Sequence, residues 1–117
     1  SHCPLLNEAA RRFAAVLANE PLANPQITVY SNALGAPYPV GADIRALLCT
    51  QMNGRVRWHG CIEHMLASGV TRFVEVGPGG VLTKMLKRRA GKDASLYSVQ
   101  DEASLNAFIG AYREETV

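Results

Sequence analysis

Hydrophobic residues at helical spacing open the chain. After Pro4, apolar side chains recur every three or four positions, at Leu5, Leu6, Ala9, Phe13, Val16 and Leu17. This periodicity is typical of a helix with one buried face, and proline is well tolerated in a first turn. Because Pro21 cannot continue a helix, we expect this helix to run from Pro4 to about Asn19.

Strand and helix patterns alternate along the rest of the chain. Short β-branched and aromatic runs predict strands, and longer runs with a helical period predict helices. Asp43 and Asp101 are suited to cap two of the helices, and Gly69 is suited to end a third. The expected strands are 27–31, 73–76 and 95–99, and the expected helices are 44–52, 58–68, 81–89 and a last helix that begins after residue 101.

This alternation of strands and helices predicts an α/β fold with a largely parallel sheet flanked by helices. Residues 1–117 are expected to form one domain or part of one, since they contain no linker, internal repeat or low-complexity tract. Three short strands make a thin sheet. We therefore expect a further segment to supply additional strands.

The composition is that of an ordinary soluble protein. Of 117 residues, 48% are hydrophobic and 19% are charged, and the net charge is only +2. So small a charge does not indicate nucleic acid or a membrane surface as a partner. The chain holds no apolar run of the roughly 18 residues that a membrane span needs, and no signal-peptide pattern. Its start at residues 1–4 (SHCP), without a methionine, fits a chain cut out of a longer one.

The segment 77–89 has two features that can bind anions. The glycine-rich turn from Gly77 to Gly80 follows a predicted strand, but it matches neither G-x-G-x-x-G nor a P-loop. A tight turn that tolerates positive φ is the alternative to a phosphate cradle. The basic run from Lys84 to Arg89 falls at the expected end of a helix. Cations there complement the helix dipole, and docking of an acidic carrier protein is the alternative interpretation.

The cysteines and histidines do not have the spacing of a metal site. Cys3, Cys49 and Cys61 lie far apart and form no C-x-x-C motif. We therefore expect buried free thiols in a reducing cytoplasm. His59 and His64 are separated by five positions, which places them about 140° apart around a helix and off a shared face. We expect no metal.

No complete nucleophilic site is present. The chain contains no G-x-S-x-G nucleophile elbow, so it is not by itself a complete serine hydrolase or acyltransferase. A histidine near a chain end, such as His2, is more often solvated than catalytic, and its spacing alone does not change that.

Several segments taken together resemble one family. They occur in the family's order, at about its spacing, from residue 1 to about residue 90. The segments are SHCPLL at 1–6, VYSN at 29–32, IRALL at 44–48 leading to Gln51-Met52, VRW at 56–58, Gly69-Val70, and FVEVGPGGVL at 73–82 with Lys87-Arg88 behind it. In combination they resemble the malonyl-CoA:acyl-carrier-protein transacylases and the related acyltransferase domains of polyketide synthases.

The resemblance implies roles for two residues. His2 falls on the family's catalytic histidine, the general base that activates a serine and then protonates the departing thiol. Gln51 falls on the residue whose backbone carbonyl accepts a hydrogen bond from that imidazole and fixes its tautomer. This carbonyl takes the place that an aspartate fills in the familiar triad.

The resemblance also implies what lies elsewhere in the protein. The nucleophilic serine, and the small ferredoxin-like subdomain, would belong to an upstream segment, and this chain would be the C-terminal part of the large hydrolase-like subdomain. The implied activity moves malonyl, or a similar acyl unit, from coenzyme A to the phosphopantetheine thiol of an acyl carrier protein, in fatty-acid or polyketide synthesis. No cofactor is implied beyond these substrates.

The sequence departs from the family pattern at two positions, and two other functions remain as alternatives. Arg55 stands where the family often has proline, and Ser1 before His2 does not determine which acyl group is accepted. A non-catalytic remnant or interaction module that keeps the fold is one alternative function. A nucleotide-binding domain built on the glycine turn is the other.

Overall fold

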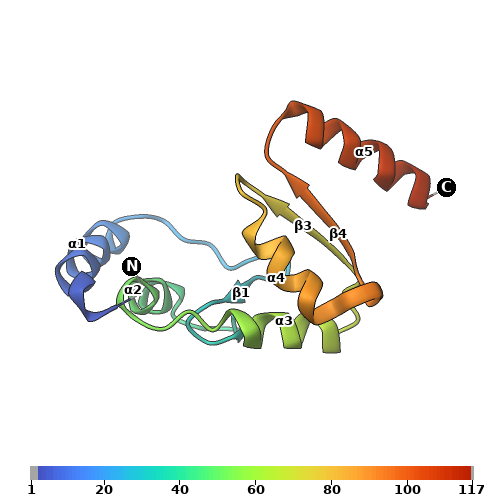
Figure 1. The fold of residues 1–117 in the computed structure, drawn as a ribbon. Helices are drawn as coiled ribbons and strands as arrows, with labels where there is room; N and C mark the ends of the chain where they lie inside the picture. Colours follow the sequence, from blue (N-terminus) through green and yellow to red (C-terminus); the bar gives the residue numbers. More distant parts are fainter. Residues whose placement is uncertain (1–2, 117) are drawn as a thin grey trace. The chain divides into compact units, whose positions relative to one another are not determined.

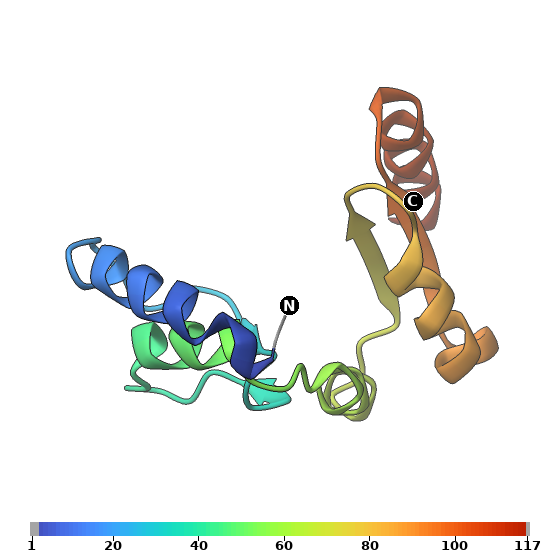
Figure 2. The same ribbon diagram turned by 60° about the vertical axis from the view of Figure 1, so that its left-hand side comes forward.

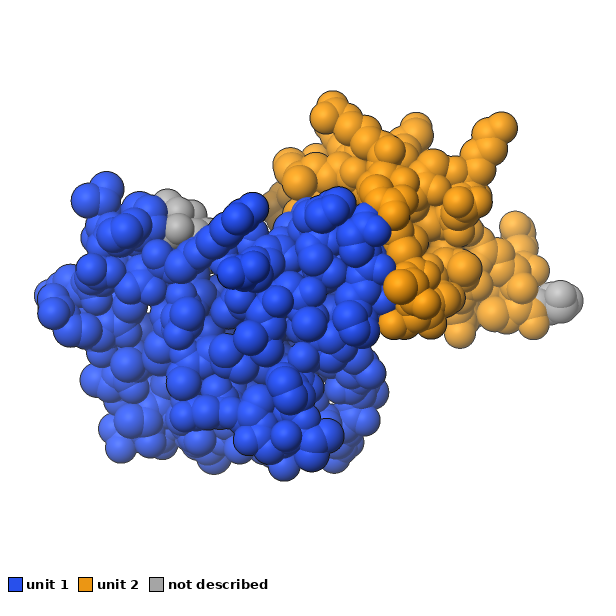
Figure 3. Space-filling model, turned by 90° about the horizontal axis from the view of Figure 1, so that it is seen from below, with its two compact units in different colours: residues 1–65 blue, residues 66–117 orange. Residues whose placement is uncertain are grey.

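The computed structural model describes residues 3–116. The chain forms two compact units, Ser1–Met65 (unit 1) and Leu66–Val117 (unit 2), which Figure 3 colours separately. Their boundary falls inside one helix, Trp58–Ala67. None of the helices in the described part is long and apolar enough to cross a lipid bilayer.

Unit 1 is built around two helices that lie side by side (Figures 1 and 2). A 3-10 turn, η1 (Pro4–Leu6), runs into α1 (Asn7–Ala18), and α2 (Ile44–Asn53) packs against both. Asp43 caps α2 as predicted, because its Oδ1 accepts a hydrogen bond of 3.0 Å from the backbone N–H of Ala46. Arg45 joins the two helices, since its guanidinium donates to the carbonyl of Leu17 at 3.0 Å and to that of Glu20.

The strand predicted at 27–31 is wrong in its extent. Only β1 (Tyr30–Ser31) forms, and it pairs antiparallel with β2 (Ala36–Pro37). The chain reverses at Gly35, which has a φ of 67° and donates to the carbonyl of Ser31 at 2.8 Å. The returning strand contains Pro37, which has no N–H to donate, so the ladder stays short. Ile27, which the pattern placed in the strand, is 79% exposed.

Unit 2 contains the parallel strands that the alternation predicts. β3 (Arg72–Val76) pairs in parallel with β4 (Ser95–Val99), in a register that runs from Arg72 opposite Ser95 to Val76 opposite Val99. The connection passes through α4 (Val81–Ala90) and a 3-10 turn, η2 (Gly91–Asp93). These elements confirm the α/β class and the expected bounds of the second and third strands to within one residue.

The last helix, α5 (Glu102–Thr116), is held against β4 by charged and aromatic side chains. Asp101 caps it as predicted, accepting from the N–H of Ser104 at 2.8 Å. Near its other end, Glu115 accepts from Arg72 Nε at 2.8 Å and from the Tyr97 hydroxyl. The hydrogen bond from the Tyr97 hydroxyl lowers the pKa of Glu115 most, and Arg72 lowers it further.

The buried interior of the described residues is small. It comprises Leu17 on α1, Cys61 and Ile62 on α3 (Trp58–Ala67), Leu86 and Ala90 on α4, and the polar Ser31. The expectation of buried thiols is correct for Cys61, whose pKa is raised by burial. It is wrong for Cys3, which precedes η1, and for Cys49 on α2, since both are half-buried.

Candidate active site

The predicted base, His2, lies outside the described residues. The structure does describe the segment that follows it directly. Cys3 precedes η1, and its carbonyl accepts from the N–H of Leu6 at 3.0 Å. Proline at the first position of this turn has no N–H that would be left unpaired. The chain therefore enters a defined element within two residues of His2.

This N-terminal segment packs against the helix that carries Gln51. η1 contacts α2, and the amide Nδ2 of Asn53 donates to Oδ1 of Asn7 at 2.7 Å. Asn7 follows His2 by five positions, and Asn53 follows Gln51 by two. The hydrogen bond thus ties the start of α1 to the C-terminal end of α2. Sequence analysis missed this asparagine pair, because nothing local relates two residues that are 46 positions apart.

Gln51 lies in the last turn of α2 and is half-buried. The final hydrogen bond of the α2 ladder runs from the N–H of Gly54 to the carbonyl of Thr50 at 3.0 Å. Carbonyls beyond that point in a helix face out of its C-terminal end and can accept from groups outside the helix. Gln51 lies in this last turn, and the acceptor role of its backbone stays a prediction.

The glycine turn of unit 2, residues 77–80, is held by hydrogen bonds from its own surroundings. Gly77, Gly79 and Gly80 have φ of 138°, 100° and 63°, in the region that favours glycine. Glu75, just before the turn, accepts from the N–H groups of Leu82 at 3.2 Å and Thr83 at 2.9 Å, and from the Thr83 hydroxyl at 2.6 Å. These hydrogen bonds lower the pKa of Glu75, and the bond from the Thr83 hydroxyl has the largest effect.

The carboxylate of Glu75 thus occupies two of the N-terminal donors of α4, the N–H groups of Leu82 and Thr83, that a phosphate would use. This geometry favours the interpretation of the turn as a scaffold over that of a phosphate cradle. Glu75 itself was not singled out from the sequence. An acidic residue placed before a glycine turn and a helix start was the only available signal.

The remaining histidines engage in separate local contacts. His64 Nδ1 lies 3.1 Å from the Tyr30 hydroxyl, and His59 Nε2 lies 3.8 Å from a carboxylate oxygen of Glu63. Within residues 3–116, no three histidine, cysteine, aspartate or glutamate side chains gather as a metal site would require.

The chain was compared with family models, with curated proteins and with solved structures. No family model matches the chain. The malonyl CoA-acyl carrier protein transacylase of Haemophilus influenzae is 40% identical over 107 residues, which are 92% of this chain and 34% of that protein. The chain therefore spans about one third of the length of this relative.

Solved structures show the same similarity. The crystal structure of the malonyl CoA-acyl carrier protein transacylase from Clostridium perfringens superposes with a TM-score of 0.89 at 31% identity, over 98% of this chain and 36% of that one. A malonyl-transacylase in complex with a type II polyketide-synthase acyl carrier protein superposes with a TM-score of 0.78 at 36% identity, over 90% of this chain and 34% of that one.

Proposed function

Since the chain belongs to the malonyl-CoA:acyl-carrier-protein transacylase family, of whose members it spans about one third, we propose that it is the C-terminal part of such an enzyme. The enzyme would move malonyl, or a similar acyl unit, from coenzyme A to the phosphopantetheine thiol of an acyl carrier protein. The observation that carries this proposal is the 40% identity over 92% of the chain. The complex of a similar malonyl-transacylase with a carrier protein supports the choice of acceptor.

In the proposed mechanism, His2 serves as the general base for a serine supplied by an upstream segment of the same protein. The imidazole takes the serine proton while the hydroxyl oxygen attacks the thioester carbonyl. Collapse of the tetrahedral intermediate breaks the C–S bond, and the imidazolium returns its proton to the departing coenzyme A sulfur. The carrier thiol then gives its proton to His2, attacks the acyl-serine, and leaves as the acyl thioester while the serine regains the proton.

Gln51 would hold the imidazole of His2 through its backbone carbonyl. A carbonyl oxygen that accepts from one ring N–H leaves the other ring nitrogen unprotonated and able to act as a base. The bond between Asn7 and Asn53 supports this role, because it ties the segment after His2 to the end of α2 where Gln51 lies. A neutral carbonyl orients the ring without adding a negative charge to the site.

The proposed enzyme needs no cofactor beyond its substrates, malonyl-CoA and the phosphopantetheinylated carrier. The phosphopantetheine thiol of the carrier must stay reduced to accept the acyl group. We therefore propose the cytoplasm as the compartment, in agreement with the free thiols of Cys3, Cys49 and Cys61.

The test uses the full-length protein that contains this segment. Incubation with malonyl-CoA should add one malonyl group to a single serine, observed by intact mass and peptide mapping. Addition of a phosphopantetheinylated carrier should then remove that group and place it on the carrier. Absence of both the adduct and the transfer would favour the non-catalytic remnant instead.

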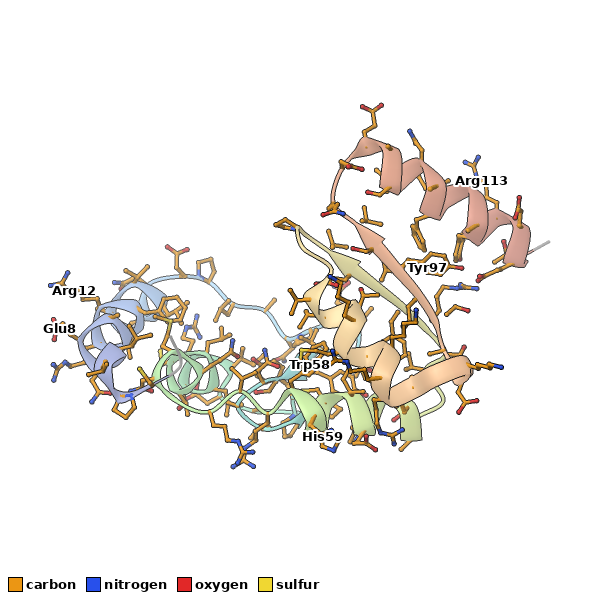
Figure 4. The ribbon with its side chains drawn as sticks, in the orientation of Figure 1. Glu8, Arg12, Trp58, His59, Tyr97 and Arg113 are labelled. Atoms are coloured by element: carbon orange, nitrogen blue, oxygen red, sulfur yellow. The ribbon has the colours of Figure 1, made fainter. Side chains whose placement is uncertain are left out.

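His2→Ala tests the base. Loss of a general base lowers turnover by about 10²–10⁴-fold, so we expect a loss of that size with an unchanged far-ultraviolet circular dichroism spectrum. Arg12→Ala is the matched control, because this side chain lies in the same unit and is 81% exposed (Figure 4). An unaltered rate in His2→Ala would remove His2 from the mechanism.

A further inference from the structure

Two sets of hydrogen bonds fasten α1 to α2, one at each end of the helix pair. At one end, Asn53 Nδ2 donates to Oδ1 of Asn7 at 2.7 Å. At the other end, the Arg45 guanidinium donates to the carbonyl of Leu17 at 3.0 Å and to that of Glu20. Because the first residue of α1 meets the last residue of α2, the two helices run antiparallel. We call the bond between Asn7 and Asn53 the asparagine clasp.

The asparagine clasp lies at the end of α2 that the proposed mechanism uses. η1 directly precedes Asn7 and also contacts α2. In an antiparallel pair, the residues before Asn7 run toward and past the C-terminal end of α2, where the carbonyls of the last helical turn point outward. Gln51 belongs to that turn, and His2 lies five positions before Asn7 in the sequence. The clasp therefore couples the segment that follows the base to the turn that carries its predicted acceptor.

Local structure does not account for either asparagine. Asn7 stands at the first position of α1, but its side chain does not cap that helix, since Leu6 takes the N-cap position without a side-chain hydrogen bond. Asparagine is a weaker helix former than alanine, so the last position of α2 is not filled by a residue chosen for helix stability. The two amides instead bond to each other across 46 positions. Such a departure from local preference is expected where a residue serves a function.

The backbone directly after Asn53 is fixed by Gly54. The N–H of Gly54 donates to the carbonyl of Thr50 at 3.0 Å. A Cβ at Gly54 would lie 2.6 Å from that same carbonyl oxygen, so any larger residue would force the backbone to shift. The chain thus leaves α2 along a path that has room only for glycine. Asn53, which immediately precedes this glycine, therefore has a defined position from which to present its amide.

We propose that Asn7 and Asn53 are positioning residues for the acyl transfer. Through the asparagine clasp they hold the segment after His2 against the last turn of α2, so that the imidazole stays aligned with the Gln51 carbonyl. This inference rests on the proposed function, and it adds two residues that take no part in the proton and acyl transfers themselves. Misplacement of a catalytic group slows a reaction strongly, because orientation contributes much of the rate.

The experiment measures both half-reactions of the full-length enzyme in Asn7→Ala and in Asn53→Ala. His2 would act as the base in each half-reaction, so transfer of malonyl onto the serine and transfer from the serine to the carrier should both slow by about tenfold. The acid limb of the pH–rate profile should move to lower pH, because an imidazole that loses an acceptor for its N–H is protonated less readily. The double variant should be no slower than the slower single variant, since each substitution breaks the same bond.

Two aspartate variants test the hydrogen bond itself. Asn7→Asp keeps an oxygen that can accept from Asn53 Nδ2, and its negative charge suits the start of a helix. This variant should retain turnover within about threefold of wild type in about 0.5 M salt, which screens the added charge. Asn53→Asp removes the donor and places a second acceptor against Oδ1 of Asn7, so it should be at least as slow as Asn53→Ala.

Two control variants separate position from stability. Asn19→Ala makes the same change at the other end of α1, where the Asn19 amide bonds within its own helix to the carbonyl of Ala15 at 3.5 Å, and it should keep the wild-type rate. Arg45→Met removes the bonds at the far end of the helix pair. Because hydrogen bonds from a charged donor are about twice as strong as neutral ones, Arg45→Met should lower the thermal midpoint more than Asn53→Ala does. Both half-reactions of Arg45→Met should nevertheless stay within about twofold of wild type.

The proposal is overturned if Asn7→Ala and Asn53→Ala keep wild-type rates while His2→Ala loses activity. A loss confined to the carrier half-reaction would overturn it too, and so would an Asn7→Asp variant as slow as Asn53→Asp. The same holds if Arg45→Met, assayed below its thermal midpoint, slows both half-reactions as much as Asn53→Ala does. Failure of the proposed function would look different, because wild type would then not acylate the carrier, or His2→Ala would keep the wild-type rate.

Discussion

The segment 54–57 and the glycine turn 77–80 both lead the chain into a helix, but they are supported in opposite ways. In unit 2, Glu75 reaches over the glycine turn and accepts two backbone N–H groups and one hydroxyl at the start of α4. In unit 1, the residue at the start of α3 is Arg57, which cannot accept a hydrogen bond through its side chain. At one helix start a nearby carboxylate binds two of the N–H groups, whereas the Arg57 side chain at the other makes no hydrogen bond or ion pair within residues 3–116.

This difference bears on which of the two helix starts could bind a ligand. A turn whose donors are already occupied by its own carboxylate has little left for a ligand, although its glycines attract notice in the sequence. A helix start that carries a cation gives up local stability. The glycine turn that looks like a ligand site is therefore better explained as a structural turn.

The largest effect on stability is expected at the contact that supports segment 54–57. Gly35 has a φ of 67°, and a Cβ there would lie 3.0 Å from the Cβ of Arg57. Gly35→Ala should therefore lower the free energy of unfolding by about 2–4 kcal/mol, from backbone strain plus steric overlap. Gly41→Ala is the matched control, because Gly41 has a φ of 75° but nothing within 4 Å. Gly41→Ala should lower the free energy of unfolding by only about 1 kcal/mol. Chemical denaturation measures both variants. Equal losses would show that this contact does not matter.

A smaller effect, on activity, is expected at the end of α2. Gln51→Ala keeps the backbone carbonyl that would orient His2, so kcat for malonyl transfer should fall by less than about tenfold, against about 10²–10⁴-fold for His2→Ala. Steady-state rates with saturating malonyl-CoA and carrier measure the ratio. If Gln51→Ala were as damaging as His2→Ala, the side chain rather than the carbonyl would hold the base.

The smallest effect is expected at the cap in unit 2, and it should depend on pH. Because the pKa of Glu75 is lowered in the folded chain, its carboxylate stabilises the fold above the unfolded pKa of about 4.3, and this stabilisation is lost as pH falls through the folded pKa. Glu75→Gln should lower the thermal midpoint by about 2–4 °C near pH 7 and by progressively less below about pH 4. Glu114→Gln, on exposed α5, is the control. A difference that persists at low pH would contradict this role of the charge.

Several features follow from residues that are neighbours in the chain, and these could be predicted. Asp43 and Asp101 cap α2 and α5, Gly69 takes a φ of 87° after α3, and the strand 95–99 has the predicted bounds. The signals for a cap or a turn lie within about four residues, where sterics and a single hydrogen bond decide the outcome. The candidate dyad of His2 and Gln51 came only from the resemblance to a family, since neither residue has a distinctive local pattern.

The sequence by itself determined the helices, the two parallel strands, the α/β class and the positive φ of Gly69, because each depends on the period of apolar residues or on backbone sterics. Only the tertiary structure decided that residues 27–31 form a two-residue strand, that Asn7 meets Asn53, and that the Glu75 carboxylate closes the glycine turn. The tertiary structure also showed that Arg55 and Arg57 have no partner among the described residues. Pairing of strands, side chains and charges depends on which distant segments the fold brings within a few ångströms, and no local pattern records that.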